Sequence, residues 1–199
     1  MSNQAYELGF ESVGLDVQIW PSARIAFPEA ISIGDSVIID DFAFLVGGTR
    51  TQIGSFVHLS SFTSITGGGE FSMGDFAGCS AGCRIATGTE DFLGGSLTNP
   101  AVPAPYRQAE RSFVRIERHA ILGTDVAVMP GITIGEGVSV GAKSLILEDC
   151  EPWTVYAGTP ARPIRDRPSQ RILELEEKLR EELYDEDGAY IPRARRASR

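Results

Sequence analysis

The sequence predicts an all-β solenoid, and a six-residue repeat is the main observation behind this prediction. Between residues 116 and 151, an aliphatic side chain returns at every sixth position: Ile116, Leu122, Val128, Ile134, Val140 and Ile146. A helix would repeat its apolar face about every 3.6 residues, and an ordinary strand would do so every second residue. A period of six therefore indicates a short strand followed by a corner, and three such units make one rung of a triangular parallel β-helix.

A second set of positions extends the period towards the N-terminus. Apolar residues at 13, 33, 53 and 73 lead four further triplets and are 20 residues apart, which is 18 for a rung plus two extra residues at one corner. With the two rungs that begin at Ile116 and Ile134, the chain has six rungs. Because strands stack at about 4.8 Å, we expect a prism roughly 29 Å tall.

The repeat divides the chain into a core and three attachments. Residues 1–12 are expected to be an irregular lead-in, and residues 13–165 should form the β-helix domain. The insertion at 87–113 is longer than the roughly 15 residues expected of an ordinary connection, so we predict an ordered arm that packs on a neighbouring subunit. Residues 166–199 are predicted to form a C-terminal helix followed by a basic tail. Only the tail is expected to be disordered. An apolar stripe on this helix should pack on the end of the prism or on a neighbour, and it consists of Ile172, Leu173, Leu179 and Leu183.

Composition and charge exclude several classes of partner. The net charge of -9 argues against nucleic acid, which would need a basic face on the protein. No stretch of 18 residues is apolar and the N-terminus does not resemble a signal peptide, so we expect a cytoplasmic protein with no membrane partner. Cys79, Cys83 and Cys150 fall on inward positions, where core packing is expected rather than metal binding.

The repeat, the insertion and the segment after the last rung together resemble the hexapeptide-repeat acyltransferases, whose parallel β-helix is left-handed. The resemblance covers about Val13 to Arg165. The ending TVYAGTPARPIRDR, residues 154–167, is similar to the segment that closes the helix in sugar and xenobiotic acetyltransferases. The insertion TGTEDFLGGSLTNPAVP is more similar to the branch that acts on amino sugars, some of them nucleotide-linked.

This resemblance implies an enzyme that moves an acetyl group from acetyl-CoA to the amine of an amino sugar, and the nucleotide-linked amino sugars are the favoured acceptors. It also implies a homotrimer with the thioester in a groove between two prisms. Apolar groups on the flat outer faces, among them Phe44, Phe56 and Phe62, agree with such an assembly. The alternative is an O-acetyltransferase that acts on a sugar or antibiotic hydroxyl and needs a stronger base.

Two histidines are candidates for the general base. His58 directly precedes the inward Leu59, so its ring should point outward and titrate near neutral pH, although an ordinary surface residue would look the same. His119 lies three residues after Ile116 at a corner, where we expect it to be exposed and close to the returning arm. Its alternative role is to fix the arm through hydrogen bonds. The resemblance favours His58 as the base, with His119 second.

The root of the arm carries two acids. In galactoside-type relatives the catalytic histidine lies in the corresponding loop, soon after a Thr-Gly pair similar to Thr87-Gly88. This chain has Glu90 and Asp91 in that region and no histidine. The departure suggests that these carboxylates bind the acceptor amine or accept its proton, although a solvated acidic loop is the alternative. The resemblance also implies that Asn99 hydrogen-bonds the acceptor.

The coenzyme A site is implied by the resemblance, which places the pantetheine arm along a corner of the last rungs. The positions concerned are Gly123, Thr124, Gly141, Ala142, Lys143 and Leu147, with Arg162 and Arg165 near the nucleotide phosphates. The glycines and small residues would let pantetheine approach the backbone amides. Glu148 stands where relatives often have a lysine, so Lys143 or the arginines must bind phosphate. Rung six lies about 14 Å above rung three, a pantetheine length, so His58 should lie near the thioester.

Two other classes of protein use the same fold. A β-helix carbonic anhydrase needs three histidines around zinc, and this chain has two histidines, so we expect no metal site. A non-catalytic scaffold subunit would share the repeat but would not bind acyl-CoA. Backbone amides at a corner, near Gly67 to Gly69 or Gly123, are candidates for stabilising the oxyanion of an acyl-transfer reaction.

Overall fold

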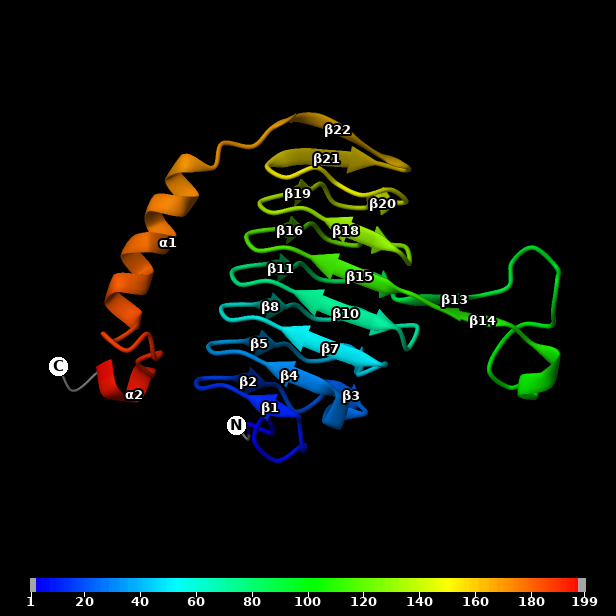
Figure 1. Cartoon of the computed structure of the whole chain (residues 1–199), viewed down its shortest axis with the longest axis horizontal. Coiled ribbons are helices and arrows are strands. Elements are labelled where there is room, and N and C mark those ends of the chain that lie inside the picture. The colour runs from blue at the N-terminus through cyan, green and yellow to red at the C-terminus, as the bar shows by residue number, and fades with distance from the viewer. Residues whose placement is uncertain (1–2, 197–199) are drawn as a thin grey trace.

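The computed structural model describes residues 3–196 and shows a three-sided prism of stacked parallel strands (Figure 1). Face A stacks β1 (Ser12–Val13), β4 (Ile31–Ile33), β7 (Arg50–Ile53), β10 (Glu70–Met73), β15 (Phe113–Ile116) and β18 (Ile132–Ile134). Face B stacks β2 (Gln18–Ile19), β5 (Ile38–Ile39), β8 (His58–Leu59), β11 (Gly78–Cys79), β16 (Ile121–Leu122), β19 (Ser139–Val140) and β21 (Thr154–Gly158), with β22 (Ala161–Asp166) antiparallel to β21. Face C stacks β3 (Arg24–Ala26), β6 (Phe44–Val46), β9 (Ser64–Thr66), β12 (Arg84–Ala86), β17 (Ala127–Val128) and β20 (Leu145–Ile146).

The predicted parallel β-helix of six rungs is confirmed, and β21 adds a partial seventh turn. The leading apolar positions pair directly from rung to rung, so that Ile33 lies between Val13 and Ile53, and Ile116 between Met73 and Ile134. Each inward column is therefore an unbroken stack of apolar side chains. Burial of an aliphatic side chain contributes about 1.5–3 kcal/mol, and this column repeats the gain at every rung.

The three cysteines are buried in the core with free thiols, as their inward positions predict. Burial, with a smaller effect of Asp149, raises the pKa of Cys150 to about 12. Cys83 donates a hydrogen bond to the carbonyl of Gly123 at 3.3 Å, which ties two neighbouring rungs together. These thiols therefore act as small apolar side chains of the core.

Three edges join the faces, and we name each edge after the faces that it joins. The A/B edge comprises residues 14–17, 34–37, 54–57, 74–77, 117–120 and 135–138. The B/C edge comprises residues 20–23, 40–43, 60–63, 80–83, 123–126 and 141–144. The C/A edge comprises residues 27–30, which include the 3-10 turn η1 (Pro28–Ala30), and residues 47–49, 67–69, 87–112, 129–131 and 147–149.

Residues 3–11 cover the first rung. The side chain of Asn3 donates to the carbonyl of Val17 at 2.6 Å and accepts from the amide of Ile19 at 3.1 Å. Ala5 is fully buried beside it. The lead-in thus satisfies backbone groups that the lowest rung would otherwise leave exposed at the end of the sheet.

The arm leaves the C/A edge as a two-stranded hairpin (Figure 1). Its root is formed by β13 (Gly88–Glu90) and β14 (Ala109–Arg111), which pair in antiparallel fashion. Beyond the root the chain forms a loop that contains the short 3-10 turn η2 (Ala104–Tyr106). The picture shows this loop projecting away from the prism.

The C-terminal segment runs down the side of the prism rather than across its end. Helix α1 (Gln170–Leu183) docks along the A/B edge, where Arg180 forms an ion pair with Asp75 at 2.9 Å. The alternative that the apolar stripe packs on the end of the prism is thus wrong, because α1 docks along its side. Packing of the stripe on a neighbour stays a prediction. The basic tail was expected to be disordered, yet Arg193–Arg196 form helix α2, and residues 197–199 lie outside the described part. Neither helix within residues 3–196 is long and apolar enough to span a membrane.

Candidate active site

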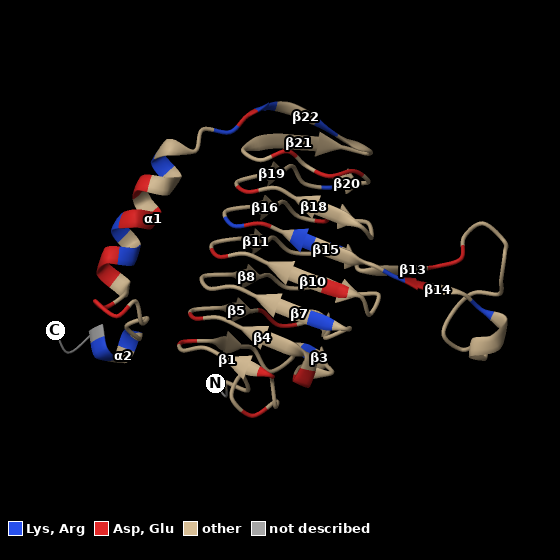
Figure 2. Cartoon of the chain, viewed as in Figure 1, with Lys and Arg blue, Asp and Glu red and all other residues tan. Residues whose placement is uncertain are grey.

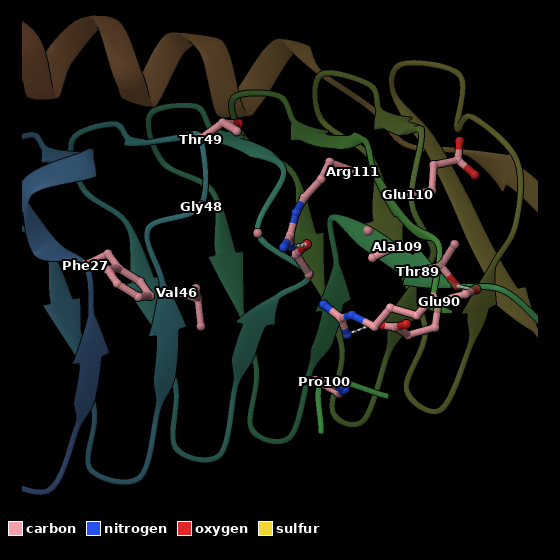
Figure 3. A pocket seen from close by; sticks show the side chains of 14 residues that line it. Phe27, Val46, Gly48, Thr49, Thr89, Glu90, Pro100, Ala109, Glu110 and Arg111 are labelled. Carbon is pink, nitrogen blue, oxygen red and sulfur yellow. Dashed lines mark hydrogen bonds and ion pairs between the residues drawn. The ribbon is translucent and has the colours of Figure 1, made fainter. Parts of the chain in front are cut away.

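One side of the hairpin root gathers the polar groups of the arm. Glu90 pairs with Ala109 and Gly88 pairs with Arg111 in the antiparallel register, so these residues share a face of the hairpin. Thr89 and Glu110 therefore lie on the opposite face. Figure 3 shows Arg111 and Glu90 beside a cavity at the C/A edge, with Glu110 pointing away from Arg111. The cavity has a volume of about 560 Å³.

Glu90 is only half satisfied. Its Oε1 atom accepts from Nη1 of Arg107 at 2.8 Å, and both side chains are mostly buried. Its Oε2 atom is shielded from solvent and has no hydrogen-bond partner among residues 3–196. A buried carboxylate oxygen without a donor costs free energy, and such atoms are rare in native proteins unless a ligand completes them.

Asp91 shows the same pattern one residue further along the arm. Its Oδ1 atom accepts from the backbone amide of Leu93 at 2.8 Å. Its Oδ2 atom is buried and lies near the backbone of Gly95 and Ser96, but it accepts no hydrogen bond of normal geometry within the described chain. The Leu93 amide, helped by the amides of Gly95 and Ser96, holds the pKa of Asp91 below its ordinary value despite partial burial. Asp91 is therefore a carboxylate at neutral pH. It lines a second cavity of about 670 Å³ together with Glu90 and Arg107.

Asn99 lies on the projecting loop, directly before Pro100, which lines the same cavity as Glu90. Its side-chain oxygen accepts from the backbone amide of Ala101 at 2.9 Å, and its φ of 76° lies in the left-handed region. One lone pair of the oxygen is therefore occupied by its own turn. The side-chain amide group and the second lone pair of the oxygen are left to contact an acceptor.

His58 points outward from face B, as its position before Leu59 predicts. Its Nε2 atom lies 2.9 Å from Oδ2 of Asp40 on the rung below, and the imidazole is half-exposed. This contact fixes the orientation of the ring and occupies its Nε2 atom. Face B is separated from the arm by the B/C edge and face C, so within one chain His58 does not meet Glu90 or Asp91.

The prediction that His119 is exposed near the arm is wrong. Only 6% of the residue is accessible, because helix α1 covers it at the A/B edge. Its Nε2 atom lies 2.6 Å from Oε2 of Glu176, and its ring stacks on Phe76 with centroids 5.2 Å apart. The sequence did not reveal this contact, since Glu176 is 57 residues away and one of many glutamates on an otherwise exposed helix.

Glu176 is the centre of this covered network. Burial alone would raise its pKa, but hydrogen bonds from Arg180 and His119, together with the charge of Arg118, hold the pKa below its ordinary value. Arg180 approaches at 2.8 Å and Arg118 at 3.2 Å. Both carboxylate oxygens are thereby paired, and the network joins the helix to the prism.

The structure changes the expected role of the corner glycines on the upper rungs. The amides of Gly123 and Gly141 already donate to carbonyls of the next rung at 2.8 Å, so neither is available to pantetheine or to an oxyanion. Each glycine is instead required by packing, since an added Cβ at Gly123 would lie 2.7 Å from the amide nitrogen of Ala142. The amides of Thr124 and Ala142 have no hydrogen-bond partner within residues 3–196, and both residues are exposed on the B/C edge.

The cations expected to bind the coenzyme phosphates are all exposed at the upper end of the prism. Lys143 lies 3.9 Å from Asp125, and Arg162 forms an exposed pair with Glu148 at 3.4 Å. Arg165 on β22 has no ion pair within the described chain. The exposed Leu147 lies at the opposite side of face C from Lys143. The predicted coenzyme positions therefore flank face C rather than forming one corner.

Metal ligands are not gathered anywhere in the described part of the chain. No group of three or more histidine, cysteine or acidic side chains between residues 3 and 196 has the arrangement needed to hold a metal ion. His58 and His119 lie on face B and under α1, respectively, and each imidazole nitrogen that is engaged contacts a carboxylate.

Two arginines of the site escaped the sequence analysis. Arg107 pairs with Glu90, and Arg111 lies against the corner formed by Gly67 and Gly68. Alternation along β14 would have placed residues 107, 109 and 111 on one face. The sequence alone does not give this alternation, because the insertion lacks the six-residue period and its strand pairing is known only from the structure.

Comparison with known proteins identifies relatives over most of the chain, although no protein-family model matches. The chain is 38% identical over 174 residues to dTDP-4-amino-4,6-dideoxy-D-glucose acyltransferase of Escherichia coli, which covers 87% of this chain and 90% of that protein. Among solved structures, a serine-to-alanine variant of AntD, an N-acyltransferase from Bacillus cereus, was solved with dTDP-4-amino-4,6-dideoxyglucose and coenzyme A. It matches with a TM-score of 0.84 and 36% identity over 89% of this chain and 94% of that chain.

A second AntD structure, in complex with dTDP and 3-hydroxybutyryl-CoA, matches with a TM-score of 0.83 and 36% identity over 89% of this chain and 93% of that chain. These matches cover most of the chain, and the fold they share is the one described above. The protein belongs to the hexapeptide-repeat acyltransferases, left-handed β-helix enzymes that use coenzyme A thioesters.

Proposed function

We propose that this protein transfers an acyl group from acyl-CoA to the amine of a nucleotide-linked amino sugar and that the hairpin root holds the amine. The observation that supports this assignment is the pair of buried, unpartnered carboxylate oxygens on Glu90 and Asp91. An amino group suits two such acceptors better than a sugar hydroxyl does, since it offers two or three N–H donors where a hydroxyl offers one O–H. The relatives of known substrate act on, or were solved with, a dTDP-linked 4-amino sugar.

The reaction needs no covalent enzyme intermediate. The neutral amine nitrogen attacks the thioester carbonyl, the C–N bond forms, the C–S bond breaks, and the proton lost from nitrogen ends on the sulfur of coenzyme A. Asp91 accepts an N–H bond from the amine and stabilises the positive charge that develops on nitrogen during attack. Glu90, already oriented by Arg107, accepts a second N–H bond and fixes the direction of the lone pair.

The donor is proposed to lie along face C, between the B/C edge and the arm. The free amides of Thr124 and Ala142 are hydrogen-bond donors for the pantetheine carbonyls, and Arg165 and Lys143 provide charge for the phosphates. The acyl group is proposed to be acetyl. Because an AntD structure contains 3-hydroxybutyryl-CoA, both thioesters belong in the assay.

The working unit is proposed to be a homotrimer. The arm exposes Phe92 and Leu93 at 87% and 99%, and apolar side chains this exposed on a projecting loop favour a neighbouring chain as cover. His58 and the acids lie on different parts of one prism, so an imidazole could assist catalysis only from the neighbour. We propose a cytoplasmic location, where acyl-CoA occurs and the three free thiols stay reduced.

The trimer is tested by a Phe92→Ser, Leu93→Ser double variant. Light scattering after size-exclusion chromatography should show a trimer for the wild type and a shift towards monomer for the variant, with a parallel loss of activity. A monomeric, active wild type would contradict the assembly. The same assay with His58→Gln then reports whether the imidazole takes part, since a general base contributes typically 100- to 10,000-fold in rate.

The function itself is tested by following free thiol release from acetyl-CoA and 3-hydroxybutyryl-CoA with dTDP-4-amino-4,6-dideoxyglucose as acceptor. A control acceptor carries a hydroxyl in place of the amine. We expect thiol release with the amine and an amide product by mass spectrometry. Release with the hydroxyl sugar alone would establish the O-acyltransferase instead, and no release with either acceptor would contradict the proposal.

A further inference from the structure

We infer that the C/A edge below the arm is the diphosphate subsite of the nucleotide sugar, formed by the guanidinium of Arg111 and the backbone amides of Gly48 and Gly68. The inference rests on the proposed function and extends it, since it fixes where the nucleotide lies and which way it runs. The subsite occupies the same cavity as Glu90, so a single ligand would reach both (Figure 3).

Arg111 carries a charge that the protein leaves without a counter-ion. Its Nη1 atom donates to the carbonyl of Gly67, and no carboxylate lies within ion-pair distance of its guanidinium in the described chain. Its neighbour in the cavity, Arg107, is by contrast neutralised by Glu90. Glu110 follows Arg107 by three residues but points to the other side of the hairpin, as Figure 3 shows. Glu110 also lines the cavity, but it forms no ion pair with Arg111, so the guanidinium of Arg111 is left to bind a ligand.

Two glycine corners add backbone donors next to this charge. Gly48 and Gly68 have φ of 62° and 70°, line the cavity, and have amides with no hydrogen-bond partner within residues 3–196. An added Cβ at Gly68 would collide with the guanidinium of Arg111, so this side chain lies directly on a bare corner. Guanidinium forks and free backbone amides are the donors that bind phosphate oxygens most strongly in proteins.

An aromatic ring, that of Phe27, lines the end of the cavity nearest the first rung. Phe27 lines the cavity at the first corner of the C/A edge and is 62% exposed. From its corner, three steps of about 4.8 Å lead past Gly48 and Gly68 to the arm, a path of about 14 Å. That order places a nucleobase against Phe27, the diphosphate on Arg111 and the amino sugar at Glu90.

The test is calorimetric titration of dTDP into the full-length protein, which measures binding without any acyl transfer. Arg111→Ala should weaken dTDP binding by about tenfold or more, because a charge-assisted hydrogen bond is lost, and Arg111→Lys should fall between this variant and the wild type. The matched control is Arg171→Ala, an exposed arginine on α1 at the A/B edge. Binding of coenzyme A, measured for each variant, checks that the protein is folded.

Phe27→Ala tests the direction of the nucleotide separately. Loss of base stacking should weaken dTDP binding about five- to 100-fold while binding of inorganic diphosphate stays unchanged. Equal weakening of both ligands would overturn the assignment of the base to Phe27.

The outcomes separate this inference from the proposed function. If the wild type acylates the dTDP-linked amine but Arg111→Ala binds dTDP as tightly as the wild type, the subsite is wrong and the function stands. If dTDP binds through Arg111 but the amine is not acylated, the subsite stands and the function falls. A wild type that neither binds dTDP nor acylates the amine contradicts both.

Discussion

Two edges of the same prism carry clusters of charged side chains, and they differ in how completely those charges are paired. At the A/B edge, both oxygens of Glu176 are engaged by Arg118, His119 and Arg180 beneath helix α1. At the C/A edge, Glu90 and Asp91 each keep one buried oxygen without a partner. Figure 2 shows mixed charges in both places, so charge alone does not distinguish them.

The difference shows which cluster serves the fold and which serves a ligand. Buried polar groups are almost always satisfied in native proteins, so a complete network is expected wherever the protein needs only stability. The network around Glu176 meets that expectation and fastens α1 to the prism. The arm root does not meet it, and an acceptor amine would complete it. The predictions below test this contrast, beginning with the largest effect.

Removal of the Asp91 charge should affect catalysis and not stability. Asp91→Asn keeps the shape of the side chain but loses the carboxylate that stabilises charge on the attacking amine, so kcat should fall by about 100- to 10,000-fold. The measurement is thiol release with the nucleotide-linked amine. Glu177→Gln, at an exposed position of α1 that lines neither cavity, is the control and should retain activity. Equal activity of the two variants would remove the arm root from the reaction.

Removal of the Glu176 charge should have the reverse effect. Glu176→Gln leaves Arg118, His119 and Arg180 without their shared partner, and breaking a buried pair costs about 3–5 kcal/mol, towards the lower end here because the arginines are partly exposed. Chemical unfolding at one fixed protein concentration measures this loss. The control Glu174→Gln breaks an exposed pair and should cost about 0–1 kcal/mol.

The same residue should make the A/B edge sensitive to acid. Since the pKa of Glu176 is lower in the folded protein than its ordinary value of 4.5, its stabilising effect is complete above that value and is lost as pH falls through the folded pKa. The stability difference between wild type and Glu176→Gln should therefore shrink below about pH 4.5. Unfolding series at several pH values measure this, and a difference that grows in acid would refute the assignment.

Two glycines offer the smallest and most closely matched comparison. Gly68 at the C/A edge and Gly137 at the A/B edge both have positive φ, and an added Cβ would collide with Arg111 or with the ring of Trp153, respectively. Alanine in this conformation costs about 1–2 kcal/mol. Gly137→Ala should lower only stability, whereas Gly68→Ala should also raise KM for the nucleotide sugar. A KM effect in both variants would mean that the edges are not independent.

The contrast also separates what a sequence can reveal from what it cannot. The stacked columns were predictable because each inward residue repeats at a fixed spacing and meets its own equivalent on the next rung, as Ile116 meets Ile134. Glu90 and Asp91 were predictable as site residues because they stand in a loop where related proteins carry the catalytic histidine. The burial of His119 under α1 could not be predicted, because it depends on a contact with Glu176 that follows no sequence period. The bonded amide of Gly123 also needed coordinates, since pairing between rungs decides which amides remain free.

Hydrogen exchange read by mass spectrometry, with and without the dTDP-linked 4-amino sugar, tests the central claim most directly. The account predicts that the ligand slows exchange in residues 88–91 and 107–111 at the root of the arm and leaves residues 170–183 of α1 unchanged. Slower exchange in α1 with no change at the arm root would contradict it.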